Sequence, residues 1–163
     1  MRLFLLLCAS TSLLLAAPVP KAKAKPKDAE LILGTWRVES VDVDGGQNVP
    51  RQSDLEKINF IYGEKDTLKM TDMNSMSMEG TFKIDSEAKL KSIDMTMKMS
   101  VPVNSPERTI LAVYELDGDT LKLCFAQGAP GKKERPEELK AIGAKMICLA
   151  TLKRVKPEDK KDK

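Results

Sequence analysis

The stretch YELDGDTLKLCF, Tyr114–Phe125, alternates apolar and polar residues on both sides of a central Asp-Gly pair. An Asp-Gly pair between alternating runs is the strongest short-range signal of a β-hairpin, because a two-residue turn needs positive φ angles at its centre. A turn centred on this pair places Tyr114 opposite Leu121 and Ile110 opposite Phe125. The hairpin then has one apolar and one mixed face, which is typical of an antiparallel sheet wetted on one side.

Six other runs have the alternation or the apolar content of β-strands, and they recur about every ten residues. They cover residues 35–44, 57–62, 67–71, 77–84, 90–97 and 146–154. Turn-forming residues such as Gly, Asp and Ser separate most of them. Together with the hairpin, this spacing predicts about eight antiparallel strands joined by short turns, arranged as a sandwich or a barrel.

Three local features refine this pattern. The apolar phase slips by one residue near Ser40, which predicts a β-bulge in the first strand. Asp28 precedes a short apolar turn that ends at Gly34, so we expect its side chain to cap that turn. In residues 135–140 a proline is followed by two glutamates, which predicts a helix of two turns before the last strand.

The chain divides into a leader, a linker, one domain and a tail. Residues 1–17 have one basic residue, an apolar run and two final alanines, the pattern of a secretory signal peptide. Residues 18–28 alternate lysine with alanine and proline, as linkers do. Residues 29–155 suffice for one domain, and residues 156–163 form a charged tail. We therefore expect an exported protein of the periplasm, cell envelope or extracellular space, without a membrane span in its mature form.

The net charge of +3 hides an uneven distribution. Basic residues gather in the segments 18–27 and 153–163, so the predicted domain between them is mildly acidic. Binding to nucleic acid requires a clustered basic face on the folded domain. We therefore expect no nucleic-acid partner.

The chain contains no histidine, which removes Ser-His-Asp and Cys-His catalysis together with imidazole ligation of metals. It also lacks a glycine-rich phosphate loop and a dinucleotide-binding fingerprint. The acid pairs Asp42 with Asp44 and Asp117 with Asp119 flank glycine turns, and turn chemistry accounts for them. We therefore expect a protein that is not an enzyme and has no cofactor.

Methionine is over-represented, with nine residues, most of them in the middle third. Residues at every second position of a strand lie on the same face. Two groups of methionines have this spacing: Met76 with Met78, and Met95 with Met97 and Met99. Thioethers are soft ligands suited to Cu(I), so this set is a candidate metal site. The alternative, which we favour on the sequence, is that these flexible side chains fill an irregular barrel interior or a pliable cavity.

Two short motifs favour a barrel over a sandwich. Gly34-Thr35-Trp36 opens the first strand and Lys153-Arg154 ends the last one. They look like the lipocalin pattern, in which a Gly-x-Trp motif opens an up-and-down barrel and a late arginine packs over the tryptophan ring. A guanidinium over an indole gains about 0.5–2 kcal/mol. Trp36 and Arg154 are therefore expected to close the barrel floor.

The order of motifs along residues 31–155 closely resembles a lipocalin-like (calycin) domain family that is abundant in planctomycete bacteria, frequently secreted and without an established function. The segments that carry the resemblance are 34–36, 91–94, 113–125, 135–139 and 152–154. The resemblance implies an eight-stranded antiparallel up-and-down barrel with one short helix before the last strand. The family usually has proline where this chain has Leu90 and an aromatic residue where it has Leu139.

In an exported protein Cys124 and Cys148 could form a disulfide. The hairpin pairing puts Cys124 on the outer face. If Arg154 points inward with Trp36, Cys148 shares the inward phase and the sulfurs lie on opposite sides of the sheet. We therefore expect two packed thiols that are not bonded to each other.

Two functions remain open on the sequence. The first is a binding module for a small apolar ligand or partner, with a cavity lined by Tyr114, Leu121, Leu123 and Phe125. The alternative is a filled barrel that acts as a structural or interaction domain of the cell envelope. Eight-stranded barrels adopt both forms, so an internal cavity would distinguish them.

Overall fold

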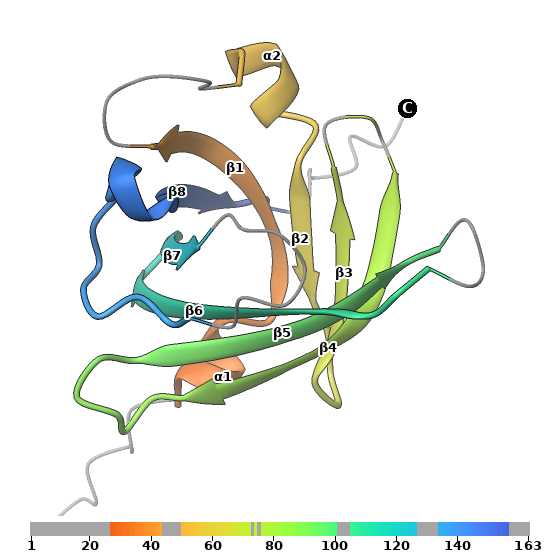
Figure 1. Ribbon diagram of the computed structural model, residues 1–163. Coiled ribbons are helices and arrows are strands. Elements are labelled where there is room, and N and C mark those ends of the chain that lie inside the picture. The colour runs from red at the N-terminus through yellow and green to blue at the C-terminus, as the bar shows by residue number, and fades with distance from the viewer. Residues whose placement is uncertain are drawn as a thin grey trace, which may run out of the picture.

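The computed structural model describes residues 27–43, 50–72, 74, 76–100, 105–126 and 134–156. Eight antiparallel strands form a closed barrel in which each strand pairs with the next one along the chain, and β8 returns to β1 (Figure 1). The strands are β1 (Gly34–Asp42), β2 (Asn59–Tyr62), β3 (Thr67–Thr71), β4 (Ser77–Asp85), β5 (Ser92–Met99), β6 (Arg108–Asp117), β7 (Thr120–Ala126) and β8 (Ile147–Arg154). The predicted all-β, eight-stranded up-and-down barrel is therefore confirmed.

The predicted signal peptide, all but the last two residues of the predicted linker, and all but the first residue of the predicted tail lie outside the described residues. Within the part of the chain that the structure describes, no helix is long and apolar enough to cross a membrane.

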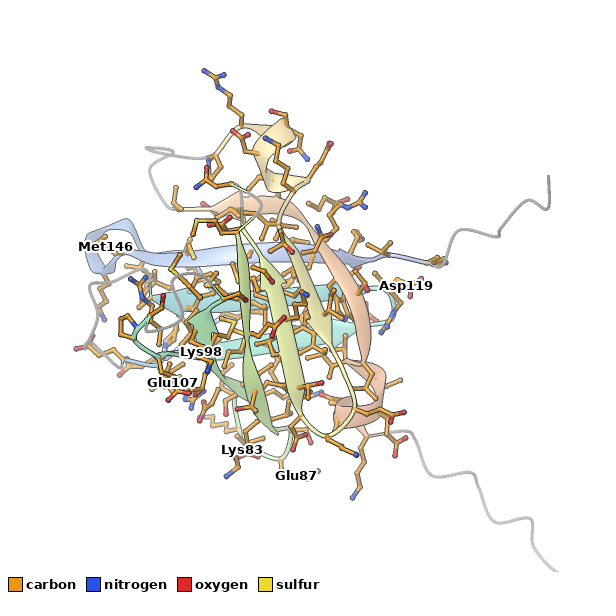
Figure 2. The ribbon with its side chains drawn as sticks, turned by 90° about the vertical axis from the view of Figure 1, so that its right-hand side faces the viewer. Lys83, Glu87, Lys98, Glu107, Asp119 and Met146 are labelled. Atoms are coloured by element: carbon orange, nitrogen blue, oxygen red, sulfur yellow. The ribbon has the colours of Figure 1, made fainter. Side chains whose placement is uncertain are left out.

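Among the residues that the structure describes, three short helices accompany the barrel: α1 (Asp28–Leu31), α2 (Gln52–Leu55) and the 3₁₀ helix η1 (Gly143–Lys145). In Figure 1, α1 lies where β1 begins, and α2 lies at the opposite end, where β1 ends. The barrel thus has two distinct ends. Figure 2 places Asp119, in the β6–β7 turn, and Met146, before β8, far apart at these ends. We call the Asp119 end the floor and the Met146 end the mouth.

The predicted helix over residues 135–140 is wrong, because residues 137–140 are bends. This segment lies flat on the outer face of the barrel, where Pro136 is buried and Leu139 packs against a cluster that includes Val113 and Cys124. Arg135 anchors the segment by donating hydrogen bonds to the Ala112 carbonyl and the Asp94 carboxylate. An irregular, extended path spreads these contacts over several strands, which a two-turn helix would not do.

The hairpin confirms the predicted faces and corrects the predicted register. Tyr114 lies opposite Leu123, two residues from the predicted partner Leu121. The two turn residues are Gly118 and Asp119, and Gly118 has a φ of +54°, at the position where a type II′ turn places glycine. A shift of two residues keeps every side chain on its face. The observed register also places Glu115 opposite Lys122, and their charged groups pair at 2.8 Å.

The predicted β-bulge is present, since the pairing of β1 with β8 shifts between Val38 and Ser40. Before the bulge, Trp36 and Val38 are buried inside the barrel, and after it Val41 packs against the same core. The bulge therefore keeps the apolar side chains of a nine-residue strand on the inner face although their spacing changes.

Candidate functional site

The floor of the barrel is built around Arg154 and Trp36, which lie directly opposite each other on β8 and β1. The guanidinium carbon of Arg154 is 4.2 Å from the centre of the Trp36 ring, the arrangement expected from the sequence. Trp36 has no exposed surface, and its indole nitrogen donates a 2.7 Å hydrogen bond to the Ile32 carbonyl. The aromatic ring therefore closes the barrel from within.

Arg154 also ties the N-terminal segment to the barrel. Its guanidinium donates to the carbonyl of Leu33 at 2.7 Å and to the carbonyl of Leu31, at the end of α1. Its third nitrogen, Nε, pairs with Asp119 at 3.3 Å. One side chain thus satisfies carbonyl groups left open by a short helix and links three segments of the chain at the floor.

Asp28 has a different role from the predicted cap. The residue before α1, Lys27, makes no side-chain cap, and the Asp28 carboxylate instead accepts hydrogen bonds from Tyr114 Oη at 2.9 Å and Lys91 Nζ at 2.8 Å. Partial burial alone would raise the pKa of Asp28, but these bonds and the charge of Lys91 outweigh it and hold the pKa below its ordinary value. The network fixes α1 to β6 and to the residue that precedes β5.

The middle of the barrel is packed with side chains. Leu121 and Leu123 have no accessible surface and Tyr114 has 2%. A side chain that lines a space large enough for water keeps accessible surface, so these three predicted lining residues belong to the packed interior. Beside them Tyr62 is fully buried, and its hydroxyl donates to the Met95 sulfur at 3.5 Å. Burial raises the pKa of Tyr62 well above its ordinary value.

Toward the mouth the inner face becomes partly exposed. Phe125, the fourth predicted lining residue, is half-buried and packs on the edge of the core. It shares this position with other apolar side chains from strand ends near the mouth: Val41, Met70, Met78 and Ile110. Leu33, Ile84 and Leu116 are half-buried near the floor as well, so the mouth differs in having the larger group of such side chains. Accessible apolar surface of this kind is the part of the interior that can accept another molecule.

The methionines of the predicted metal set divide by depth. Met95 and Met97 are buried in the core, with 0% and 2% exposure. Met78 and Met99 are half-buried and lie directly opposite each other on β4 and β5. Met76 precedes β4 and is 37% exposed. The structure therefore brings only part of the set together near the mouth.

Met70, which was absent from the predicted metal set, is the direct neighbour of Met78 on β3. The sequence did contain a signal for it, because Met70 shares the inward phase of the buried Leu68. Its proximity to Met78 depends on the pairing of β3 with β4, however, and the two residues are separated by a turn whose register the sequence leaves open.

Cys124 and Cys148 are not joined in a disulfide, as expected. Cys124 faces the outer cluster and donates to the Lys140 carbonyl at 3.3 Å, whereas Cys148 donates to the Phe125 carbonyl at 3.6 Å. Burial raises the pKa of the Cys124 thiol, although the backbone hydrogen bond partly opposes this effect. Both thiols are shielded from solvent, since Cys124 has 0% and Cys148 has 1% exposure.

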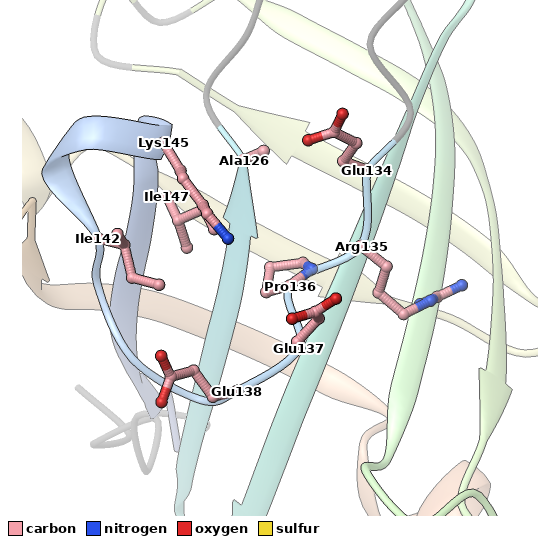
Figure 3. Close-up of a pocket in the computed structure, with 9 residues that line it drawn as sticks. All are labelled: Ala126, Glu134, Arg135, Pro136, Glu137, Glu138, Ile142, Lys145 and Ile147. Atoms are coloured by element: carbon pink, nitrogen blue, oxygen red, sulfur yellow. The ribbon is translucent and has the colours of Figure 1, made fainter.

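A hollow lies on the outer face, between the segment around Pro136 and the mouth ends of β7 and β8 (Figure 3). Its volume is about 210 Å³, below the range of roughly 300–1,000 Å³ that is usual for small-molecule sites. In Figure 3 the Arg135 side chain points away from the hollow, toward β5. Other charged residues, Glu138 and Lys145 among them, line its rim. We therefore place the candidate site at the mouth.

Comparison with protein-family models, with curated proteins and with solved structures finds no match for this chain. Among the described residues, no three Cys, Asp or Glu side chains gather in a group that could hold a metal ion.

Proposed function

We propose that this chain is an exported binding protein without enzymatic activity that holds a small, largely apolar ligand at the mouth of its barrel. The observation that carries the proposal is the group of half-buried apolar side chains that gathers at the mouth, above a packed central layer. Leu121, Leu123 and Trp36 have no exposed surface, whereas apolar side chains at the mouth, Phe125 and Ile110 among them, stay partly exposed. Accessible apolar surface on a rigid scaffold favours binding of an apolar molecule.

The chemistry of the mouth supports a ligand that is apolar and variable in shape. Met70 and Met78 supply flexible, polarizable side chains that adapt to different partners. The proposal also agrees with the resemblance to an exported lipocalin-like family and with a sequence that contains no histidine. The ligand would occupy only the outer part of the interior, because the packed layer around Leu123 leaves no room below it.

A filled barrel that acts as an interaction domain of the cell envelope is the second candidate. The packed central layer, with Ile93, Met95 and Leu152 at 0% exposure, favours it. In this case the apolar mouth would contact a protein partner and not enclose a small molecule.

Native mass spectrometry of the protein purified from its source tests the proposal, together with binding of an apolar fluorescent dye. We expect a co-purified small molecule and dye binding at the mouth. Ile110→Lys places a charge on the inner face near the mouth and should abolish dye binding. Thr109→Lys, one residue away on the opposite face, is the matched control and should retain it. A bare protein that binds no dye would refute the ligand-binding proposal and favour the interaction domain.

A further inference from the structure

Three methionines lie side by side on the inner face of three neighbouring strands. Met70 on β3 is directly opposite Met78 on β4, and Met78 is directly opposite Met99 on β5. Neighbouring strands are about 4.8 Å apart, and the inner surface of a closed barrel is concave, so the two flanking side chains lean toward the central one. We propose that these three residues, the methionine row, form a binding site for Cu(I).

The accessibility of the row separates it from the other inward methionines. Met95 is fully buried, and its sulfur already accepts the Tyr62 hydroxyl. Met97 has 2% exposure and is part of the core. All three residues of the row are half-buried, so their thioethers lie at the boundary between the core and the mouth. A metal ion can reach them without opening the packed interior.

The chemistry of the row selects a soft ion. Thioether sulfur is a neutral, polarizable donor that binds Cu(I) and has little affinity for hard cations such as Mg²⁺ or Ca²⁺, which require oxygen ligands. Three unbranched side chains, each with three rotatable bonds, can turn their sulfur atoms toward one point. A three-sulfur site therefore follows from the strand register and the side-chain type together.

The charged residues that alternate with the methionines along β3, β4 and β5 face away from the row. Strand alternation places the neighbouring charged residues, Lys69, Glu79 and Lys98, on the outer face of the barrel. Lys69 and Glu79 pair with each other there at 3.3 Å. The bound ion keeps its single positive charge, and the partial exposure of the site lowers the cost of removing that charge from water.

This inference goes beyond the proposed function, because it concerns an inorganic ion and a defined set of three sulfur atoms. The two are also tested separately. The Ile110→Lys variant, which should lose dye binding, still has the three thioethers and should still bind Cu(I). Replacement of a methionine by leucine removes a thioether but preserves the apolar character of the mouth, so dye binding should remain.

Titration of the purified protein with Cu(I) under anaerobic conditions, against a competing Cu(I) chelator, measures the affinity. We expect one ion per chain at micromolar concentrations or below. Met70→Leu, Met78→Leu and Met99→Leu should each lower the affinity by about tenfold or more, because each removes a ligand. Met146→Leu is the matched control, since Met146 is 62% exposed and lies outside the row, and it should bind as the unchanged protein does.

Nuclear magnetic resonance of the methionine methyl groups locates the ion, with Ag(I) as a redox-inert substitute. We expect the methyl resonances of Met70, Met78 and Met99 to shift and that of Met146 to remain. The fluorescence of Trp36, the only tryptophan, confirms that each variant is folded. Absence of micromolar binding overturns the proposal, and so does binding that survives Met78→Leu or that shifts methyl groups elsewhere.

Discussion

Arg154 and Trp36 face each other across the closing pair of strands, with the guanidinium carbon 4.2 Å from the ring centre. The same guanidinium binds the carbonyl groups of Leu31 and Leu33. Stacking on the indole ring requires a planar cation, and the hydrogen bonds to the two carbonyl groups require two N–H donors on neighbouring nitrogen atoms. Arginine supplies both in one side chain. The floor of the barrel therefore depends on the shape of this residue as well as on its charge.

Arg154→Lys should destabilise the protein by about 1–3 kcal/mol, because an ammonium group keeps the charge but loses the planar stack and the forked hydrogen bonds. Denaturant unfolding followed by Trp36 fluorescence measures the effect. Lys153→Arg is the control at the neighbouring exposed position, where the change should stay within about 0.5 kcal/mol. Equal stability of Arg154→Lys and the unchanged protein would contradict the role assigned to the guanidinium.

Asp28→Asn should destabilise the protein by about 1–2 kcal/mol at neutral pH, because the charged acceptor of Tyr114 and Lys91 is lost. The pKa of Asp28 is lowered in the folded state, so its contribution is present above the ordinary value of 3.8 and disappears as the pH falls through the lowered pKa. The stabilities of the variant and the unchanged protein should therefore converge in acid.

Unfolding curves of both proteins at neutral pH and in acid test this expectation. Asp54→Asn is the control, because Asp54 forms an exposed ion pair with Lys57 at 3.0 Å and such pairs contribute little. A difference between Asp28→Asn and the unchanged protein that persists undiminished in acid would show that the carboxylate charge is not the cause.

The two tyrosines should resist ionisation until the protein unfolds. Burial raises the pKa of Tyr62, and burial together with the Asp28 carboxylate raises that of Tyr114, both from an ordinary value of 10.0. The neutral form is favoured in the folded state, so stability is complete below pH 10 and falls as the pH rises further, where the unfolded chain ionises. Tyrosinate absorbance and Trp36 fluorescence should change together. Tyrosinate that forms while the fluorescence stays native would contradict this prediction.

The sequence predicted the features that depend on alternation. The faces of the hairpin, the bulge near Ser40 and the eight strands all follow from which residues are apolar, and this pattern fixes which side chains enter the core. The hairpin register was not predicted correctly, because a shift of two residues leaves the alternation unchanged and only the turn geometry at Gly118 distinguishes the two pairings.

The candidate site could be predicted only in part from the sequence. Tyr114 and Leu123 have the phase of lining residues, but phase does not tell how deep a residue lies along the barrel axis, and both are packed. The proximity of Met70 to Met99 depends on the pairing of three strands. The helix signal at residues 135–140 is a local preference, and contacts of Arg135 and Leu139 with the barrel override it.

Replacement by alanine should have very different effects on stability at two glycines, Gly118 and Gly80. At Gly118 an added Cβ meets nothing within 4 Å, so Gly118→Ala costs only the positive φ of +54°, about 1 kcal/mol. At Gly80 the added Cβ would lie 1.9 Å from the Thr96 carbonyl oxygen and 2.8 Å from the Met97 Cα, so the backbones of β4 and β5 must move apart. Gly80→Ala should therefore cost about 3 kcal/mol or more.

Gly80 also lies two residues from Met78, in the strand pair that places Met78 opposite Met99. Separation of β4 from β5 should widen the methionine row, so Gly80→Ala should weaken Cu(I) binding as well as stability, whereas Gly118→Ala at the floor should leave Cu(I) binding unchanged. Unfolding curves and the anaerobic titration measure both effects on the same samples. Equal losses of stability in the two variants would mean that β4 and β5 are not held as closely at Gly80 as the structure places them.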